Sequence, residues 1–239
     1  MNKPRTFFIG KKRIIVVSLF SGWDFFLLGF LKAYKDIIPG YAVEKSFNAC
    51  LVHRENYKHT DGTPIVEPFV QITKEEYDYK RNHVDERGRK DMADEVGIIN
   101  GLYYRTRLIQ EVSGLAIRAA IEARYGKDTI IIVIGGPPCQ GYTRLSSLNN
   151  IDPNDPRNLL VLEYLRILDE ISTGDNNGNV IGVMEEVPDF LLKKYEKIYK
   201  KFKDKALSMP FRMRRQPIVS LHHGGHQTRK RQIFMPPVF

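Results

Sequence analysis

The sequence predicts an α/β fold with a parallel sheet and helices on both of its faces. Short β-branched and apolar runs recur along the chain, at residues 14–19, 129–134, 180–184 and 232–235. Segments with a helical spacing of apolar residues separate these runs, at residues 113–125 and 158–171. Strands of continuous Val and Ile, without alternation, are typical of sheets that helices cover on both faces. We therefore expect a doubly wound, Rossmann-like sheet, with ligands bound at the carboxyl ends of its strands.

The first apolar stretch, residues 14–31, is close to the length of a bilayer span and follows a basic N-terminus. Asp24 and the Ser21-Gly22 pair in its middle argue against a membrane segment. A strand at residues 14–19, a turn at Ser21-Gly22 and a helix at residues 25–35 fit the pattern better. A glycine in such a turn lets the backbone approach a ligand, and the start of the helix offers free amides.

A second strand is expected to end at residues 41–44, roughly 20 residues after this turn. Glu44 at its end can accept hydrogen bonds from both ribose hydroxyls of an adenosine cofactor, and a surface glutamate at a strand end is the alternative. A helix at residues 46–57 follows, in which Cys50 is expected to be a small core residue.

Two charged segments interrupt the α/β pattern. The first, at about residues 58–106, is polar and has no clear period, so we expect an insertion or a mobile loop. The second, residues 193–215, is rich in lysine and arginine. It predicts either a solvated helix face or a surface that contacts phosphates.

The composition favours a polyanionic partner. The 239 residues include 37 Lys and Arg against 28 Asp and Glu, so the net charge is +9, although many basic proteins bind no nucleic acid. Two cysteines exclude a disulfide framework and a cysteine-rich zinc site, and they favour a reducing compartment such as the cytoplasm. His222, His223 and His226 lack a carboxylate or cysteine at ligand spacing, so no metal is expected.

Three groups of residues suited to chemistry lie near the ends of predicted strands. Cys139 lies in Gly135-Gly-Pro-Pro-Cys-Gln-Gly141, a rigid loop directly after a buried strand, where a thiol has the exposure expected of a nucleophile. Glu185 follows the strand at residues 180–184, and at that edge a carboxyl group can assist the attack as an acid. Arg229 and Arg231 alternate along an extended segment, so they are expected to share a face that clamps an anion or a base carbonyl.

Taken in order, these segments resemble the motif set of the C5-cytosine DNA methyltransferase family, from about residue 13 to residue 234. The resemblance lies in Ser18-Leu-Phe-Ser-Gly22, in Glu44 followed by His53-Arg-Glu-Asn56, in Gly135 to Gly141, in Asp155-Pro-Arg-Asn-Leu-Leu160, in Glu185-Glu-Val-Pro188 and in Gln227-Thr-Arg-Lys-Arg231. It implies an S-adenosylmethionine-dependent enzyme that acts on double-stranded DNA and does not enter a membrane.

The resemblance also implies roles for single residues. Cys139 would attack C6 of a flipped-out cytosine while Glu185 engages N3, so that C5 can take up the methyl group. Arg231, together with Arg229, would hold the flipped base and order the catalytic loop. The cofactor pocket would be lined by Phe20, Ser21, Gly22, Trp23, Glu44, Lys45, Pro138 and Leu160.

Four positions depart from the family pattern. Asp24 replaces a glycine of the first motif, and Lys45 stands where an apolar or aromatic residue often covers the adenine. Leu108 takes the place of an acidic residue expected to bind the adenine amine. Glu186 replaces the asparagine that usually braces the catalytic loop.

The family's target-recognition domain and two closing motifs have no visible counterpart after residue 234. We therefore expect a single catalytic domain over residues 1–239 that is one subunit of a split enzyme, with a second polypeptide supplying the rest. A truncated or degenerate homologue that only binds DNA or a partner is the alternative. A Rossmann-like dehydrogenase would explain neither residues 155–160 nor residues 227–231.

Overall fold

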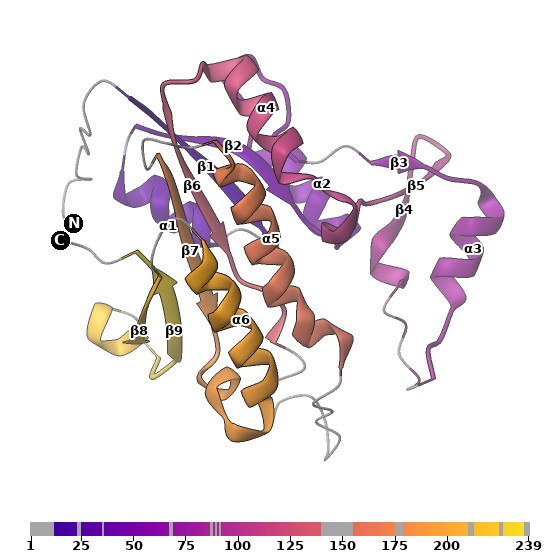
Figure 1. Cartoon of the computed structure of the whole chain (residues 1–239). Coiled ribbons are helices and arrows are strands. Elements are labelled where there is room, and N and C mark those ends of the chain that lie inside the picture. The colour runs from indigo at the N-terminus through magenta and orange to yellow at the C-terminus, as the bar shows by residue number, and fades with distance from the viewer. Residues whose placement is uncertain are drawn as a thin grey trace. The chain divides into compact units, whose positions relative to one another are not determined.

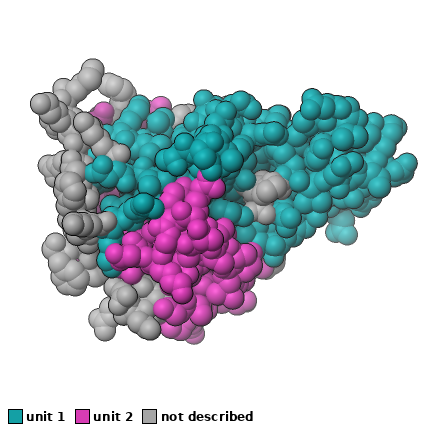
Figure 2. Space-filling view, turned by 90° about the horizontal axis from the view of Figure 1, so that it is seen from above, with its two compact units in different colours: residues 1–112 teal, residues 113–239 magenta. Residues whose placement is uncertain are grey.

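The computed structural model describes most of the chain, in two compact units that consist of Met1–Val112 and Ser113–Phe239 (Figure 2). The described residues are 12–22, 25–34, 36–66, 69–86, 88, 90, 92–139, 155–174, 179–209, 213–224 and 227–236. Trp23, Asp24, Gln140, Gly141 and His226, which the sequence singled out, lie outside them.

The first unit begins with a strand, a helix and a parallel strand, as the sequence predicts (Figure 1). These are β1 (Arg13–Leu19), α1 (Phe25–Ala33) and β2 (Ile37–Val43), with Ile14 opposite Ile37 and Leu19 opposite Val43. The apolar stretch that raised the question of a membrane segment is thus divided between a buried strand and a short helix. No helix within the described ranges is long and apolar enough to cross a bilayer.

Helix α2 (Phe47–Asn56) follows β2 and begins at Ser46, whose Oγ accepts a hydrogen bond from the Ala49 amide at 3.4 Å. A side-chain oxygen at this position pairs one of the amides that a helix start leaves without a partner. Cys50 faces the core of the unit and is 2% exposed. Its expected place as a small core residue is therefore confirmed.

The polar segment expected to be an insertion or loop folds into a small sheet. It contains β3 (Val70–Gln71), α3 (Lys74–Asn82), η1 (Ala93–Glu95), β4 (Val96–Ile99) and β5 (Leu102–Arg105), and the strands pair in the antiparallel order β3-β5-β4. Asn100 and Gly101 connect β4 to β5 with φ angles of 50° and 80°. Two residues with positive φ form the tight turn that matches the twist of a hairpin. The loop expectation was therefore wrong for this part of the chain.

The second unit contains both parallel and antiparallel strand pairs (Figure 1). The short helix η2 (Ile109–Glu111) lies at the end of the first unit. The elements of the second unit are α4 (Gly114–Tyr125), β6 (Thr129–Gly135), η4 (Pro156–Leu159), α5 (Leu160–Ser172), β7 (Val180–Glu186), η5 (Pro188–Leu191), η6 (Lys193–Tyr195), α6 (Glu196–Ser208), β8 (Arg214–Val219), η7 (Ser220–His223) and β9 (Lys230–Met235). Strands β6 and β7 are parallel, whereas β9 is antiparallel to β7 and to β8. The α/β class is confirmed, whereas the antiparallel pairing of β9 with both β7 and β8 departs from the parallel sheet that the sequence predicts.

Helices α5 and α6 bury their apolar faces in the core of this unit. On α5, Tyr164 is fully buried, and its hydroxyl donates to the Val133 carbonyl of β6 at 2.9 Å. On α6, the Phe202 ring packs against Phe234 of β9, and both contact Phe190. Edge-to-face rings of this kind add to the stability gained from burial alone. The lysines of α6 lie on the opposite, exposed face, except that Lys205 pairs with Asp169 of α5.

Gly114 allows α4 to approach α5 closely, so a methyl group there is expected to destabilise the protein. A Cβ atom on Gly114 would lie 2.5 Å from the Ile167 carbonyl oxygen and 2.7 Å from Glu170 Cβ. We expect Gly114→Ala to lower the free energy of unfolding by about 1–3 kcal/mol. Gly29→Ala on α1 meets no atom within 4 Å and is expected to raise it by roughly 0.5–1 kcal/mol. Urea denaturation followed by circular dichroism measures both changes, and equal midpoints would contradict the packing argument.

Candidate active site

The turn after β1 and the end of β2 form the first candidate site, within the first unit. Phe20 and Gly22 adopt positive φ angles of 56° and 51°. The Glu44 carboxylate accepts hydrogen bonds from the Gly22 amide and from the Ser46 amide, each at 2.7 Å. The sequence spacing that linked the glycine turn to Glu44 therefore corresponds to direct contact.

This turn fits a ligand with hydroxyl groups. The Oγ atom of Ser21 is buried and has no hydrogen-bond partner among the described residues. A buried hydroxyl without a partner is costly unless a ligand or water pairs with it. Each Glu44 oxygen already accepts one amide and retains capacity for a second donor. Ser21 and Glu44 thus offer a hydroxyl and a carboxylate with which the ribose hydroxyls of an adenosine cofactor can pair.

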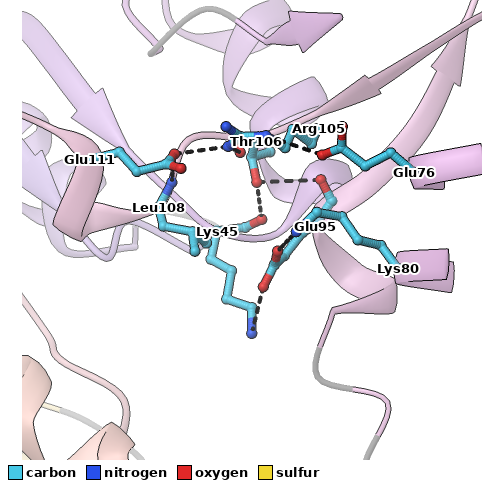
Figure 3. Close-up of polar contacts among 8 residues, drawn as sticks. All are labelled: Lys45, Glu76, Lys80, Glu95, Arg105, Thr106, Leu108 and Glu111. Atoms are coloured by element: carbon cyan, nitrogen blue, oxygen red, sulfur yellow. Dashed lines mark hydrogen bonds and ion pairs between the residues drawn. The ribbon is translucent and has the colours of Figure 1, made fainter. Parts of the chain in front are cut away.

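Lys45 does not extend freely from the end of β2, because its ammonium pairs with the insertion (Figure 3). Its Nζ lies 3.3 Å from Glu95 Oε1, while Lys80 Nζ lies 3.1 Å from Glu95 Oε2. Glu95 is only 5% exposed, so two cations balance one buried carboxylate. The Thr106 hydroxyl also donates to the Lys45 carbonyl at 2.6 Å. The expected contact of Lys45 with the cofactor remains a prediction.

Leu108 follows the insertion at the position where the family pattern has an acidic residue. Its amide donates to Glu111 Oε2 at 3.0 Å, and the same oxygen pairs with Arg105 at 2.8 Å (Figure 3). The Leu108 side chain has no polar atom with which to bind an adenine amine. The carboxylate closest to it in sequence, Glu111, is thus already bound to an arginine.

The second candidate site lies in the second unit, around Cys139. Residues Gly136, Pro137 and Pro138 join the end of β6 to Cys139, which is half-buried and unbonded to another sulfur. A Cβ atom on Gly136 would lie 3.3 Å from Glu185 Oε2, so the loop passes close to the carboxylate of β7. Glu185 Oε1 forms an ion pair with Arg231 Nε of β9. Glu185 belongs to β7 itself, which runs two residues further than the sequence predicts.

The charges around Cys139 act in opposite directions on its thiol. Burial raises the pKa of Cys139, and the negative charges of Glu186 and Glu185 raise it further, whereas Arg231 lowers it. A thiolate is the nucleophilic form of cysteine, so every negative charge nearby disfavours the active form. The protonation of the two neighbouring carboxyl groups therefore affects the reactivity of Cys139.

Glu186 is among the most buried charged residues that the structure describes. From the sequence it was recognised only as a departure from the family pattern. It is 1% exposed, and its Oε2 accepts a hydrogen bond from the Val187 amide at 2.9 Å. Burial raises the pKa of Glu186 to about 8. Gln232, directly opposite on β9, is 8% exposed and was not predicted to be part of any site.

Arg229 and Arg231 differ in their surroundings. Arg231 is partly buried beside Glu185, whereas Arg229 is exposed. Both line a hollow of about 500 Å³ between the ends of β8, η7 and β9, together with Ile218, Ser220, His223 and Gly224. The structure therefore brings Arg231 to the proposed acid, and it places Arg229 at the rim of a neighbouring cavity. Ser220 and His223 had no sequence signal that linked them to this place.

Pro138 and Leu160 also belong to the second unit. Pro138 directly precedes Cys139, and Leu160 begins α5. Asp155 accepts a hydrogen bond from the Arg157 amide at 2.9 Å and pairs with the Arg157 guanidinium at 2.7 Å, so it stabilises the turn before the helix. The expected contacts of Pro138 and Leu160 with a cofactor remain predictions.

A strand-end cysteine, a paired glutamate and arginine, and a glycine turn that contacts a glutamate are features typical of α/β enzymes that bind a nucleotide-type cofactor. Residues 103–236, more than half of the chain, match the family model described as C-5 cytosine-specific DNA methylase. The chain belongs to this family.

Curated relatives agree with this assignment over short segments. A stretch of 39 residues is 54% identical to the type II methyltransferase M.FnuDI of Fusobacterium nucleatum and covers 16% of this chain and 11% of that protein. A stretch of 61 residues is 36% identical to the type II methyltransferase M.AquIA of a Picosynechococcus species and covers 25% of this chain and 24% of that protein.

Among solved structures, the fold is similar to that of a DNA modification methyltransferase encoded within a prophage of E. coli, with a TM-score of 0.58 and 19% identity. It is also similar to the Entamoeba histolytica methyltransferase EhMeth, with a TM-score of 0.55 and 14% identity. These alignments cover 93% and 96% of this chain but 46% and 54% of the other chains. The chain thus spans about half the length of the solved structures that it matches.

Proposed function

We propose that this protein transfers a methyl group to C5 of cytosine in double-stranded DNA, with Cys139 as the nucleophile. The observation that supports this most strongly is the group formed by Cys139, Glu185 and Arg231, from three separate segments of the second unit. The family model matches over all three residues. The arrangement supplies a nucleophile, an acid and a cation, as addition to a pyrimidine ring requires.

The proposed reaction begins on a base that has left the DNA stack. The Cys139 sulfur bonds to C6, and a proton taken up from water is shared between Glu185 and N3, so that the ring does not accumulate negative charge. C5 then becomes nucleophilic and takes up the methyl group. Water takes the C5 proton, the N3 proton is given up again to Glu185, and cleavage of the sulfur–C6 bond restores the aromatic ring and the thiolate. Arg231 orients Glu185 through their ion pair.

S-adenosylmethionine would supply an electrophilic methyl group on a sulfonium centre. Ser21 and Glu44 would bind its ribose, because they offer a free hydroxyl and a carboxylate that the Gly22 amide holds in place. Phe20, Lys45, Pro138 and Leu160 complete the expected pocket. The Leu108 side chain cannot accept a hydrogen bond from the adenine amine, so the side chains give the adenine fewer polar contacts than the family pattern would.

We further propose that a second polypeptide supplies target recognition. About half of each solved relative has no counterpart in the 239 residues. The segment shared with the Picosynechococcus protein is 25% of this chain and 24% of that protein, so the two chains have similar lengths. That protein is named as a type II methyltransferase. The relative from Bacillus paralicheniformis is longer, since its shared segment is 34% of this chain and 18% of that protein.

A methyl-transfer assay tests both parts of the proposal. The chain is mixed with double-stranded DNA, with labelled S-adenosylmethionine and with the polypeptide encoded beside it. We expect label on cytosine C5 only when both polypeptides are present. Transfer by the chain alone would contradict the requirement for a second polypeptide, and DNA binding without transfer under any combination would support a degenerate, binding-only homologue instead.

A further inference from the structure

Glu186 and Gln232 form a buried polar pair that the proposed chemistry does not use. They stand opposite each other in the antiparallel ladder of β7 and β9, next to the pair Met184 and Phe234. Directly opposed residues leave the same face of a sheet, with Cβ atoms roughly 5 Å apart. Both are buried; Glu186 ends β7 directly after Glu185, and Gln232 lies opposite it on β9. The pair is therefore part of the support of the candidate active site.

Each member of the pair has one side-chain oxygen that is buried without a hydrogen-bond partner. Glu186 Oε1 and Gln232 Oε1 both lack a partner among the described residues, while Glu186 Oε2 already accepts from the Val187 amide. Two acceptor oxygens on facing side chains cannot pair with each other unless one of them is protonated. A proton on Glu186 would satisfy both atoms with a single O–H to O hydrogen bond.

The charges around Glu186 also favour a proton there. Glu186 interacts electrostatically with three titratable or charged groups, which are Glu185 on its own strand, Arg231 on β9 and Cys139 in the loop after β6. Arg231 is already paired with Glu185, so it does not neutralise a second carboxylate fully. Burial raises the pKa of Glu186 to about 8, in agreement with the geometry.

We propose that Glu186 is a positioning residue that works as a neutral carboxylic acid, donating a hydrogen bond to Gln232 and leaving the surroundings of Cys139 without a second negative charge. This inference rests on the proposed function of Cys139. A protonated Glu186 can both donate and accept hydrogen bonds, as the neutral amide of the asparagine in the family pattern can. When Glu186 ionises, the hydrogen bond to Gln232 is lost and the new charge disfavours the Cys139 thiolate.

Thiol alkylation tests this inference without any methyl transfer. The rate of carbamidomethylation of Cys139 by iodoacetamide is measured by mass spectrometry between about pH 6.5 and 9.5, in the full chain and in Glu186→Gln. The neutral glutamine cannot ionise, so the ratio of the variant's rate to the parent's reports the charge on Glu186. We expect a ratio near 1 at pH 6.5 that rises to roughly tenfold, with its midpoint near pH 8.

Controls separate this effect from others. Glu196→Gln, at an exposed position at the start of α6, is expected to keep the ratio at 1 throughout. Glu186→Asn is expected to behave like Glu186→Gln. Cys50 does not interfere, since burial raises its pKa to about 12. Circular dichroism at each pH verifies folding, because a group with a raised pKa in the folded state lowers stability as the pH rises from 4.5 through 8.

Two results would overturn the inference. A ratio that is high and constant from pH 6.5 upward means that Glu186 is ionised throughout and that the Gln232 amide donates to it. A ratio of 1 at every pH means that Glu186 does not act on the thiol. Neither result depends on methyl transfer, so failure of the inference is distinguishable from failure of the proposed function, which the transfer assay with the second polypeptide measures.

Discussion

Cys139→Ser is expected to abolish methyl transfer, with a loss on the order of 10³-fold or more, because a serine hydroxyl at this position has no base to activate it. The loss is expected to appear in the covalent step itself. With DNA that contains 5-fluorocytosine, fluorine at C5 prevents the elimination that normally releases the enzyme. The parent protein, assayed with its second polypeptide and cofactor, is expected to remain attached to this DNA.

The matched control for this substitution is Cys50→Ser. Cys50 is buried in the first unit, where its Sγ contacts the Glu44 carbonyl oxygen at 3.4 Å, and a serine hydroxyl can donate to the same carbonyl. We expect this variant to form the adduct as the parent does, as judged by a gel shift that survives denaturation. An adduct with Cys139→Ser would identify a different nucleophile.

The second large effect is expected from the ion pair between Glu185 and Arg231. Glu185→Gln and Arg231→Leu are each expected to lower kcat/KM for methyl transfer by about 100-fold, the usual contribution of a positioned acid. Because the two side chains act as one unit, the double variant is expected to lose little more than either single variant. Steady-state rates of the four proteins form a double-mutant cycle.

Two exposed residues serve as controls for this cycle. Arg214→Leu changes an arginine on the neighbouring strand β8, and Glu196→Gln changes a glutamate on α6; both positions are exposed. We expect near-parental rates from both. Losses from Glu185→Gln and Arg231→Leu that multiply in the double variant would show that the two residues act independently, against the positioning role of Arg231.

The sequence predicted the residues of the site better than their environment. Gly22 and Glu44 were linked by spacing and are in direct contact, and Glu185 was expected at a strand end near Cys139. The burial of Glu186 was not predicted, because the strand was expected to end at residue 184. In the structure β7 continues to Glu186, so the alternation of buried residues along the strand includes it. The opposition of Glu186 and Gln232 depends on the antiparallel register of β9, which a sequence of apolar runs does not determine.

The small sheet in the insertion shows a local signal that was available. Asn100-Gly101 lies between Ile98-Ile99 and Leu102-Tyr103, which is a strong indication of a two-residue hairpin. The density of charged residues around it suggested a loop instead. By contrast, nothing in the sequence indicates that Lys45 and Lys80 share Glu95, since this contact joins residues far apart in the chain.

Strand β8 lies at the end of the strand order in the second unit, next to the strand that contains Arg231. A strand at the border of a sheet can template the addition of a strand from another molecule. Along β8, Arg214 and Arg215 are exposed and Pro217 lacks an amide proton, so this border is poorly suited to self-association. The border next to Arg231 is therefore protected against edge-to-edge aggregation with copies of the chain.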